Sequence, residues 1–204
     1  LLLSLFPQNG ESIPRLRFKG FGSQWNRVKI GDVGSVSMCK RVFKEQTSSK
    51  GDVPFYKIGT FGGIADSYIS RELFDNYKSK YPYPQKGDIL ISASGSIGRI
   101  VVYSGKNEYF QDSNIVWINH DDNITNSFLK HFYNIIEWSG IEGSTIKRLY
   151  NDNILNTTIA FTNLDEQNAI SSFLDLCDTR ILSSENALQQ LLCLKNTLIG
   201  EMFI

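Results

Sequence analysis

The amino-acid sequence predicts an α+β (mixed α/β) globular domain followed by a long C-terminal coiled-coil helix. Two observations predict this fold class: short apolar runs between turn residues occupy residues 25–162, and a heptad repeat occupies residues 163–204. The composition agrees, because 41% of the 204 residues are hydrophobic and 21% are charged, as in folded soluble proteins. Residues 1–24 are expected to be the end of a preceding helix and a linker.

The first six residues, Leu1–Phe6, read as the last turns of an apolar helix, which Pro7 and the following turn residues stop. They align with Leu198–Phe203 at an offset of 197 residues. Such a repeat is typical of a tandem chain of helix, linker, domain and helix, cut near a repeat boundary. We therefore expect either the second half of a two-domain chain or a half-length protein that pairs with itself.

The body of the chain mixes strand and helix patterns. Alternating or short apolar runs predict strands at residues 27–30, 54–58, 88–92, 99–103, 114–118 and 154–161. Residues 125–138 change to helical spacing, with Thr125 placed to cap the helix and Phe128, Leu129 and Phe132 on one face.

The C-terminal segment carries a seam of ten positions spaced by four and three residues. Eight of them are apolar or Cys, and these form the expected coiled-coil interface: Ile170, Leu174, Cys177, Ile181, Leu188, Leu191, Leu198 and Met202. The other two positions, Ser184 and Lys195, are polar, and polar residues in a seam can fix register and partner at some cost in stability. A helix of about 38 residues reaches on the order of 57 Å. Pairing with another helix is favoured over packing on its own domain, which remains the alternative.

Charge is distributed unevenly along the chain although the net charge is zero. Residues 1–110 contain 16 Lys and Arg against 9 Asp and Glu, a net charge of +7, and residues 111–204 carry −7. This indicates a basic working face for a nucleic-acid partner; the alternative is two solvated surfaces that happen to differ. Three Cys residues without close spacing predict no disulfide framework and a cytoplasmic location, and no apolar run approaches the roughly 20 residues of a membrane span.

The motifs of several enzyme classes are missing from the sequence. There is no Pro-Pro pair of the kind that an adenine methyltransferase motif requires, and no Asp/Glu-x-Lys triplet of a metal-dependent nuclease. The Gly-containing segment 94–98 lacks the lysine of a nucleotide-binding loop. His120 and His131 fall on different predicted elements, so the sequence predicts no catalytic residue, no bound metal and no cofactor.

Three stretches, in their order and spacing, resemble the specificity subunits of type I restriction-modification systems. They are Phe6-Pro7 with Pro14–Phe21, Trp25 and Ile30–Asp32; Gly87–Ser92 with Gly95–Gly98; and Leu164, Glu166-Gln167, Ile170, Phe173-Leu174, Leu191, Leu194-Lys195 and Leu198–Phe203. The resemblance implies a non-catalytic target-recognition domain at residues 25–162 that reads one half of a split double-stranded DNA site. It also implies a spacer helix at residues 163–204, paired with a second spacer helix from the same subunit or a second copy.

The partners that the resemblance implies carry the chemistry. Modification subunits dock on the spacer helices and methylate adenine with S-adenosylmethionine, and restriction subunits with ATP and Mg join for cleavage. A coiled-coil protein-interaction scaffold without sequence-specific DNA binding is the alternative.

DNA reading requires phosphate contacts for affinity and base-edge contacts for specificity. The phosphate candidates are Lys40, Arg41, Lys44, Lys57, Arg99, Lys147 and Arg148. The base-reading candidates, chosen for paired donors or acceptors, are Arg41, Gln111, Asn114 and Arg148, with Tyr56, Tyr68 and Ser94 adding polar contacts from loops. The alternative for each is a solvated or structural side chain.

Overall fold

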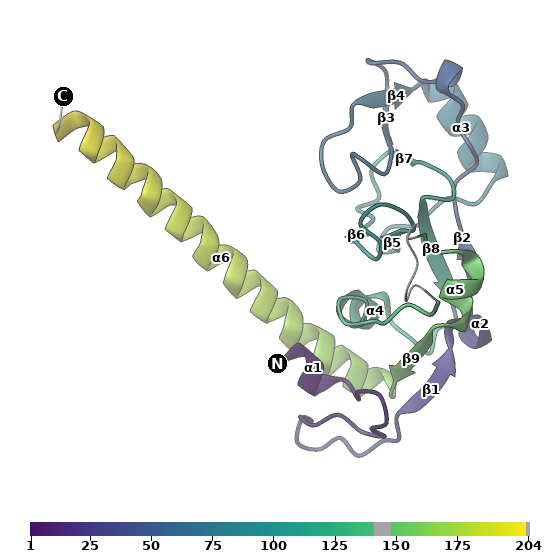
Figure 1. Cartoon of the computed structure of the whole chain (residues 1–204), viewed down its shortest axis with the longest axis vertical. Coiled ribbons are helices and arrows are strands. Elements are labelled where there is room, and N and C mark those ends of the chain that lie inside the picture. The colour runs from purple at the N-terminus through teal and green to yellow at the C-terminus, as the bar shows by residue number, and fades with distance from the viewer. Residues whose placement is uncertain (141–147, 203–204) are drawn as a thin grey trace.

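The protein is described by a computed structural model that covers residues 1–140 and 148–202. A folded body contains residues 1–140 and 148–174, and one long helix leaves it and extends into solvent as far as Met202 (Figure 1). The predicted order, a mixed domain followed by a long helix, is therefore confirmed, and the fold class is α+β.

The elements follow one another in this order along the chain. The helices of the described residues are α1 (Leu2–Leu5), α2 (Ile30–Val33), the 3₁₀ turn η1 (Lys44–Gln46), α3 (Arg71–Lys80), α4 (Asn126–Phe132), α5 (Asn151–Asn156) and α6 (Leu164–Met202). The strands are β1 (Asn26–Lys29), β2 (Gly34–Ser37), β3 (Val53–Tyr56), β4 (Ser67–Ile69), β5 (Ile89–Ser92), β6 (Ile100–Val102), β7 (Tyr109–Phe110), β8 (Ile115–His120) and β9 (Thr158–Phe161).

The strands of the described residues form three small sheets. The central sheet has the order β2-β8-β5-β6 and is antiparallel throughout. A second sheet has the order β4-β3-β7, in which β3 and β7 run parallel. Strands β1 and β9 form an antiparallel pair that closes the body beside the start of α6 (Figure 1).

Strands β5 and β8 lie between two hydrophobic cores. In β5, Ile89 and Ile91 face the core that contains α4, whereas Leu90 faces the other core. In β8, Val116 faces the first core and Trp117 the second. Because successive side chains of a strand point to opposite faces, a strand between two cores must be apolar at every position. This explains the continuous apolar runs that predict these two strands.

The second core is rich in aromatic residues. Tyr109 lies at its centre, with ring centroids of Phe74, Tyr77 and Tyr83 between 6.1 and 6.4 Å away. Helix α3 covers this core through Phe74 and begins at Ser70, whose side chain accepts a hydrogen bond from the Leu73 N–H at 3.2 Å. The sequence reading missed this helix, although the Ser cap is a start signal.

The N-terminal segment is part of the first core and is not a detached linker. Phe6 is fully buried, and its ring lies 5.2 Å from Phe128 and 5.5 Å from Phe132. Trp25 joins the same cluster at 6.4 Å. The expected boundary at residue 24 therefore does not coincide with a break in packing, because Leu5 and Phe6 are buried in the first core and Leu2 packs against it.

Most predicted elements are present with shifted ends. The strands predicted at 54–58, 88–92, 99–103 and 114–118 correspond to β3, β5, β6 and β8. The helix predicted at 125–138 stops at Phe132, after which Asn134 and Ile135 form tighter turns with the His131 and Phe132 carbonyls. The strand predicted at 154–161 begins only at Thr158, because residues 151–156 form α5.

Candidate nucleic-acid interface

A short turn between β7 and β8, residues 111–114, gathers several of the predicted DNA-contacting side chains. Among the described non-glycine residues only Ser113 has a positive φ, of 54°. The Asn114 N–H donates to the Asp112 carbonyl at 2.6 Å, and the Ile115 N–H donates to the Gln111 carbonyl at 3.1 Å. These bonds fix a tight turn of the kind that Asp, Ser and Asn favour.

Five candidates meet at this turn, which we call the 111–114 turn. Arg41 Nε donates to Asp112 Oδ2 at 2.8 Å, and Arg148 Nη2 donates to the Ser113 carbonyl at 3.3 Å. Ser94 Oγ donates to Asn114 Oδ1 at 2.9 Å. Gln111 and Asn114 belong to the turn itself. The four predicted base readers and Ser94 are thus brought within one region from four separate parts of the chain.

Two of the five candidates, Gln111 and Asn114, already use their side-chain oxygens in hydrogen bonds within the protein. Gln111 Oε1 accepts the Ile58 N–H at 3.0 Å, and Asn114 Oδ1 accepts the Ser94 hydroxyl. Their side-chain oxygens therefore have a structural role, and the side-chain NH₂ groups are the parts suited to reading a base. The Ser94 hydroxyl, another candidate, likewise has a structural role, because it donates to the turn.

Arg148 lies at the edge of a groove beside the turn. Its guanidinium lies 5.8 Å from the centroid of the Tyr150 ring, and the Leu149 N–H donates to the Ala93 carbonyl at 2.8 Å. The groove has a volume of about 380 Å³ and is also lined by Met38 and Ser113. Lys147, the other half of this predicted basic pair, lies outside the described residues.

The remaining candidates are spread over the lobe that contains the second core. Lys57 Nζ lies 2.9 Å from Asp66 Oδ1, and the Arg99 guanidinium lies 5.3 Å from the centroid of the Phe61 ring. Lys40 Nζ lies 4.8 Å from the Tyr81 ring. Lys44 is the first residue of η1 and is exposed, and Tyr68 pairs with Ser48 through two backbone hydrogen bonds.

Tyr56, predicted to contact DNA from a loop, lies at the end of strand β3 and packs against aromatic neighbours. Its ring stacks on Phe110 at 5.8 Å, and both residues line a pocket of about 210 Å³ with Phe61 and Tyr103. Burial raises the pKa of Tyr56, and Glu108 adds to the effect, so the hydroxyl stays protonated at neutral pH.

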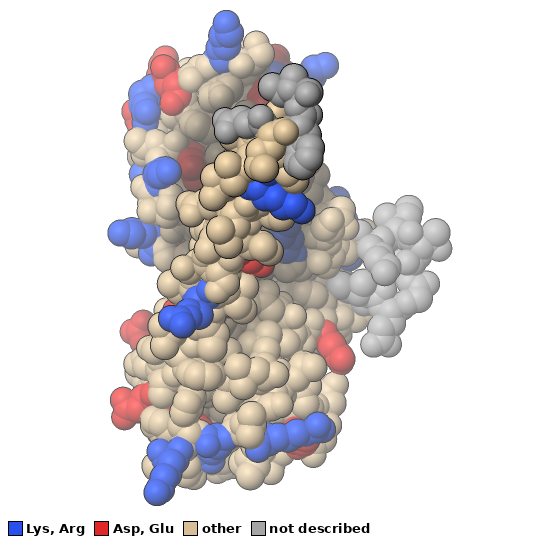
Figure 2. Space-filling model, turned by 90° about the vertical axis from the view of Figure 1, so that its left-hand side faces the viewer, with Lys and Arg blue, Asp and Glu red and all other residues tan. Residues whose placement is uncertain are grey.

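The basic side chains do not form one continuous patch on the face seen in Figure 2, where Lys and Arg alternate with uncharged surface and with Asp and Glu. Two candidate cations, Arg41 and Lys57, have carboxylate partners. The excess of positive charge in residues 1–110 therefore does not gather into a single basic patch on this face (Figure 2). The sequence reading missed Asp112, Ser113 and Asp66; the run Asp112–Asn114 is a turn signal that would have indicated the first two.

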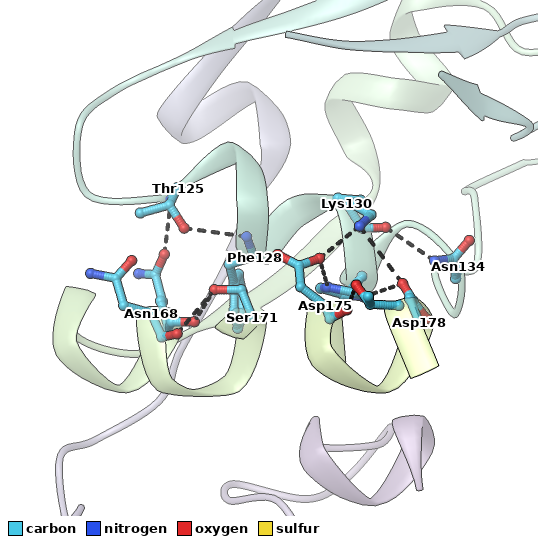
Figure 3. A network of polar contacts seen from close by, with 11 residues as sticks. Thr125, Phe128, Lys130, Asn134, Asn168, Ser171, Asp175 and Asp178 are labelled. Atoms are coloured by element: carbon cyan, nitrogen blue, oxygen red, sulfur yellow. Dashed lines mark hydrogen bonds and ion pairs between the residues drawn. The ribbon is translucent and has the colours of Figure 1, made fainter. Parts of the chain in front are cut away.

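The first turns of α6 are fixed to the body by buried polar side chains. Gln167 is fully buried; its Nε2 donates to the Asn123 and Thr162 carbonyls at 2.7 Å, and its Oε1 accepts the Thr125 N–H at 2.9 Å. Thr125 also caps α4 by accepting the Phe128 N–H, as predicted (Figure 3). The start of the long helix is therefore specified by hydrogen bonds as well as by apolar packing.

An ion-pair cluster follows about two turns later along α6. Lys130 Nζ lies 2.7 Å from Asp175 and 3.7 Å from Asp178, and His131 Nε2 lies 3.0 Å from Asp175 (Figure 3). His131, Asp175 and Asp178 together have the donor types of a metal site. Lys130 already supplies positive charge to both carboxylates, so the cluster is explained as a clamp between α4 and α6 and needs no ion.

The predicted coiled-coil interface divides into two parts. Ile170 and Leu174 are only 2% and 5% exposed, because they pack in the first core of the body. Their assignment to a seam for a second helix is wrong. Cys177 is half-buried at the junction, whereas the later positions are exposed: Ile181, Leu188, Leu191, Leu198 and Met202. Leu192, Leu194 and Ile199 are exposed as well, so this apolar surface is wider than the predicted seam.

The fold is that of a binding domain followed by a projecting helix. The domain carries the polar 111–114 turn, and the helix carries an exposed apolar face (Figure 1). Residues 22–192 match the family described as type I restriction modification DNA specificity domain, and the chain belongs to this family. The expected resemblance is confirmed. The match includes most of α6, so the helix is part of the family pattern.

Individual relatives agree with this assignment. The chain is 59% identical over 153 residues to a putative type I restriction enzyme specificity subunit, S.HindORF215P, of Haemophilus influenzae. This alignment covers 74% of the chain and 40% of the relative.

Solved structures share the fold. The HsdS subunit of Thermoanaerobacter tengcongensis matches with a TM-score of 0.64 at 18% identity, over 91% of this chain and 43% of that one. A chain from a study of assembly and conformational transition of the type I R-M system matches with a TM-score of 0.69, also at 18% identity, over 93% and 45%. The chain therefore spans less than half the length of the relatives that it matches.

In the described part of the chain, no helix has the length and apolar character needed to cross a membrane.

Proposed function

We propose that this chain reads one half of a two-part DNA site as the recognition component of a type I restriction-modification complex and performs no chemistry itself. The observation that carries the proposal is the family match over residues 22–192, which joins the body and the helix in one unit. The 111–114 turn supports it, because it gathers side chains suited to base edges from segments far apart in sequence.

The exposed part of α6 supports a second element of the proposal. The apolar positions from Ile181 to Met202 are open to solvent, and in a single helix these side chains stay in contact with water, which is unfavourable. We propose that a second spacer helix covers it, from the same protein or from a second copy, and that the modification subunits dock there. Restriction subunits complete the complex.

The cofactors of the reaction belong to those partners in this proposal. S-adenosylmethionine is used by the modification subunits, and ATP and Mg by the restriction subunits, all in the cytoplasm. This chain contributes sequence preference and spacing.

The experiment that tests the proposal is a methylation map. The full-length protein that carries this chain is expressed with its modification subunit in a host without adenine methylation, and N6-methyladenine is located by single-molecule sequencing. A two-part motif is expected. Replacing residues 25–162 with those of a relative should change one half of the motif if both spacer helices belong to one chain, and both halves alike if they come from two copies, with the spacing unchanged in either case.

Two results would contradict the proposal. A motif that does not respond to the replacement would remove DNA reading from this domain. Assembly of the complex without any sequence preference would favour the coiled-coil scaffold, which the family match does not favour.

A further inference from the structure

Arg41 and Asp112 form an ion pair in which the carboxylate is more shielded from solvent than the guanidinium. The contact uses Arg41 Nε, at 2.8 Å from Asp112 Oδ2. Within the described residues no hydrogen bond engages the two terminal nitrogens of Arg41. The Arg41 side chain is 59% exposed and that of Asp112 only 16%. The carboxylate thus holds the guanidinium from the protein side and leaves its outer edge in solvent.

Both members of the pair are held in place by further contacts. Asp112 belongs to the 111–114 turn, whose Asn114 carbonyl accepts the Ala93 N–H at 2.7 Å. On the other side, Tyr109 Oη donates to the carbonyl of Lys40, the residue before Arg41, at 3.0 Å. Tyr109 is itself buried in the aromatic core. The position of the Arg41 side chain is therefore largely fixed before any ligand arrives.

The chemistry of this arrangement favours a base edge over a phosphate. A guanidinium presents its outer N–H groups as a planar fork, which matches the O6 and N7 acceptors of guanine in the major groove. Asp112 offsets the positive charge of Arg41, which weakens its attraction to phosphates in general. A cation that only contacts phosphates has no need of a partly buried carboxylate at Nε.

We propose that Arg41, oriented by Asp112, reads one guanine of the DNA half-site through O6 and N7. Arg41 is the specificity-determining residue, and Asp112 is a positioning residue that does not touch the DNA. This inference rests on the proposed function, because it names one base contact within the same recognition surface.

The test uses the full-length protein in complex with its modification subunits and a randomised DNA library from which bound or methylated sites are sequenced. The variants are Arg41→Lys, which keeps the charge but loses the fork, and Asp112→Asn, which loses the orienting carboxylate. Asp66→Asn is the matched control, since Asp66 also pairs with a candidate cation, Lys57, but both side chains are well exposed.

Arg41→Lys and Asp112→Asn should reduce the preference for guanine at the same single position by roughly ten- to a hundred-fold, with the other positions unchanged. Asp112→Asn should at the same time raise affinity for unrelated DNA, because it removes a negative charge. The control should raise that affinity without changing any base preference. A merely structural role for Asp112 would instead lower preference at all positions together.

The outcomes separate this inference from the proposed function. If the wild-type complex selects a two-part site but neither variant changes a guanine position, Arg41 does not read a base and the proposed function stands. A half-site without guanine would also overturn the inference. If the wild-type complex selects no sequence, the proposed function fails and the inference fails with it.

Discussion

Arg17 and Glu166 lie 149 residues apart in the sequence, yet the guanidinium of Arg17 binds both carboxylate oxygens of Glu166, at 2.6 and 2.7 Å. The Glu166 side chain is 1% exposed and also accepts the Thr162 hydroxyl at 2.8 Å. The pair therefore connects the N-terminal segment to the first turn of α6. It is a charge-assisted, two-point contact of the strong kind.

Replacing Arg17 with Met should lower the free energy of unfolding by about 3–5 kcal/mol, because it leaves the Glu166 charge buried without a partner. Urea denaturation of the chain measures this effect. Arg15→Met is the control, since Arg15 pairs with Glu11 at the surface, where such pairs contribute at most about 1 kcal/mol. Equal effects of the two substitutions would contradict the structural role of Arg17.

Replacing Phe6 with Ala should cost about 3–5 kcal/mol of stability, as expected for a large aromatic side chain lost from a core. The neighbouring Leu3 is 57% exposed, so Leu3→Ala should change stability by less than about 0.5 kcal/mol. Thermal unfolding distinguishes the two. A small effect at Phe6 would show that the N-terminal segment is a linker, as the sequence alone predicts.

The Asp175 carboxylate should contribute stability that disappears in acid. Burial acts to raise its pKa, but hydrogen bonds and charge from Lys130 and His131 outweigh burial and hold the pKa below the usual value. A carboxyl with a lowered folded-state pKa stabilises the fold above its unfolded pKa of roughly 4, and this contribution is lost as the pH falls through the lower folded value.

The measurement for Asp175 compares the wild type with Asp175→Asn between pH 7 and pH 3 by urea denaturation. The variant should be less stable at pH 7, and the difference should shrink as the pH falls below about 4. A difference that stays constant over this range would exclude a role for ionised Asp175 in the clamp.

Replacing Leu188 and Leu191 with Asp should abolish helix pairing and leave the body folded. Both side chains are exposed and lie beyond the last buried position of α6, Leu174. Light scattering reports the assembly state, and circular dichroism reports folding. Gln189→Asp with Gln190→Asp introduces the same charge beside the seam and should preserve pairing. Unfolding of the body together with loss of pairing would contradict the independence of the two parts.

Periodicity in the sequence was sufficient to predict the elements whose apolar residues follow one another directly or recur at regular spacing. The heptad spacing predicted α6, and the continuous apolar runs predicted β5 and β8, because their packing is written in every residue. Ile170 and Leu174 show where periodicity misleads. They continue the same apolar spacing as Leu188, but a helix that leaves a domain uses one face for two partners in succession.

The candidate site was only partly predictable. Residue type identified Arg41, Arg148, Gln111 and Asn114 as capable of reading bases, and the fold brings them to one turn. Their partners were not predictable, since the contacts of Arg41 with Asp112 and of Ser94 with Asn114 depend on tertiary structure. The strands β2, β4 and β7 were missed because they are short and, unlike β5 and β6, contain no run of three apolar residues.

The anchoring of α6 has a mechanical consequence. From Leu174 to Met202 the helix extends about 42 Å beyond its last buried residue, at 1.5 Å per residue. A tilt of about 5° at the root would move the tip by roughly 4 Å over this length, which is comparable to the rise of a DNA base pair. The hydrogen bonds of Gln167 and the charges around Lys130 therefore determine the direction of the helix. Their rigidity limits how far the C-terminal end of the helix can move.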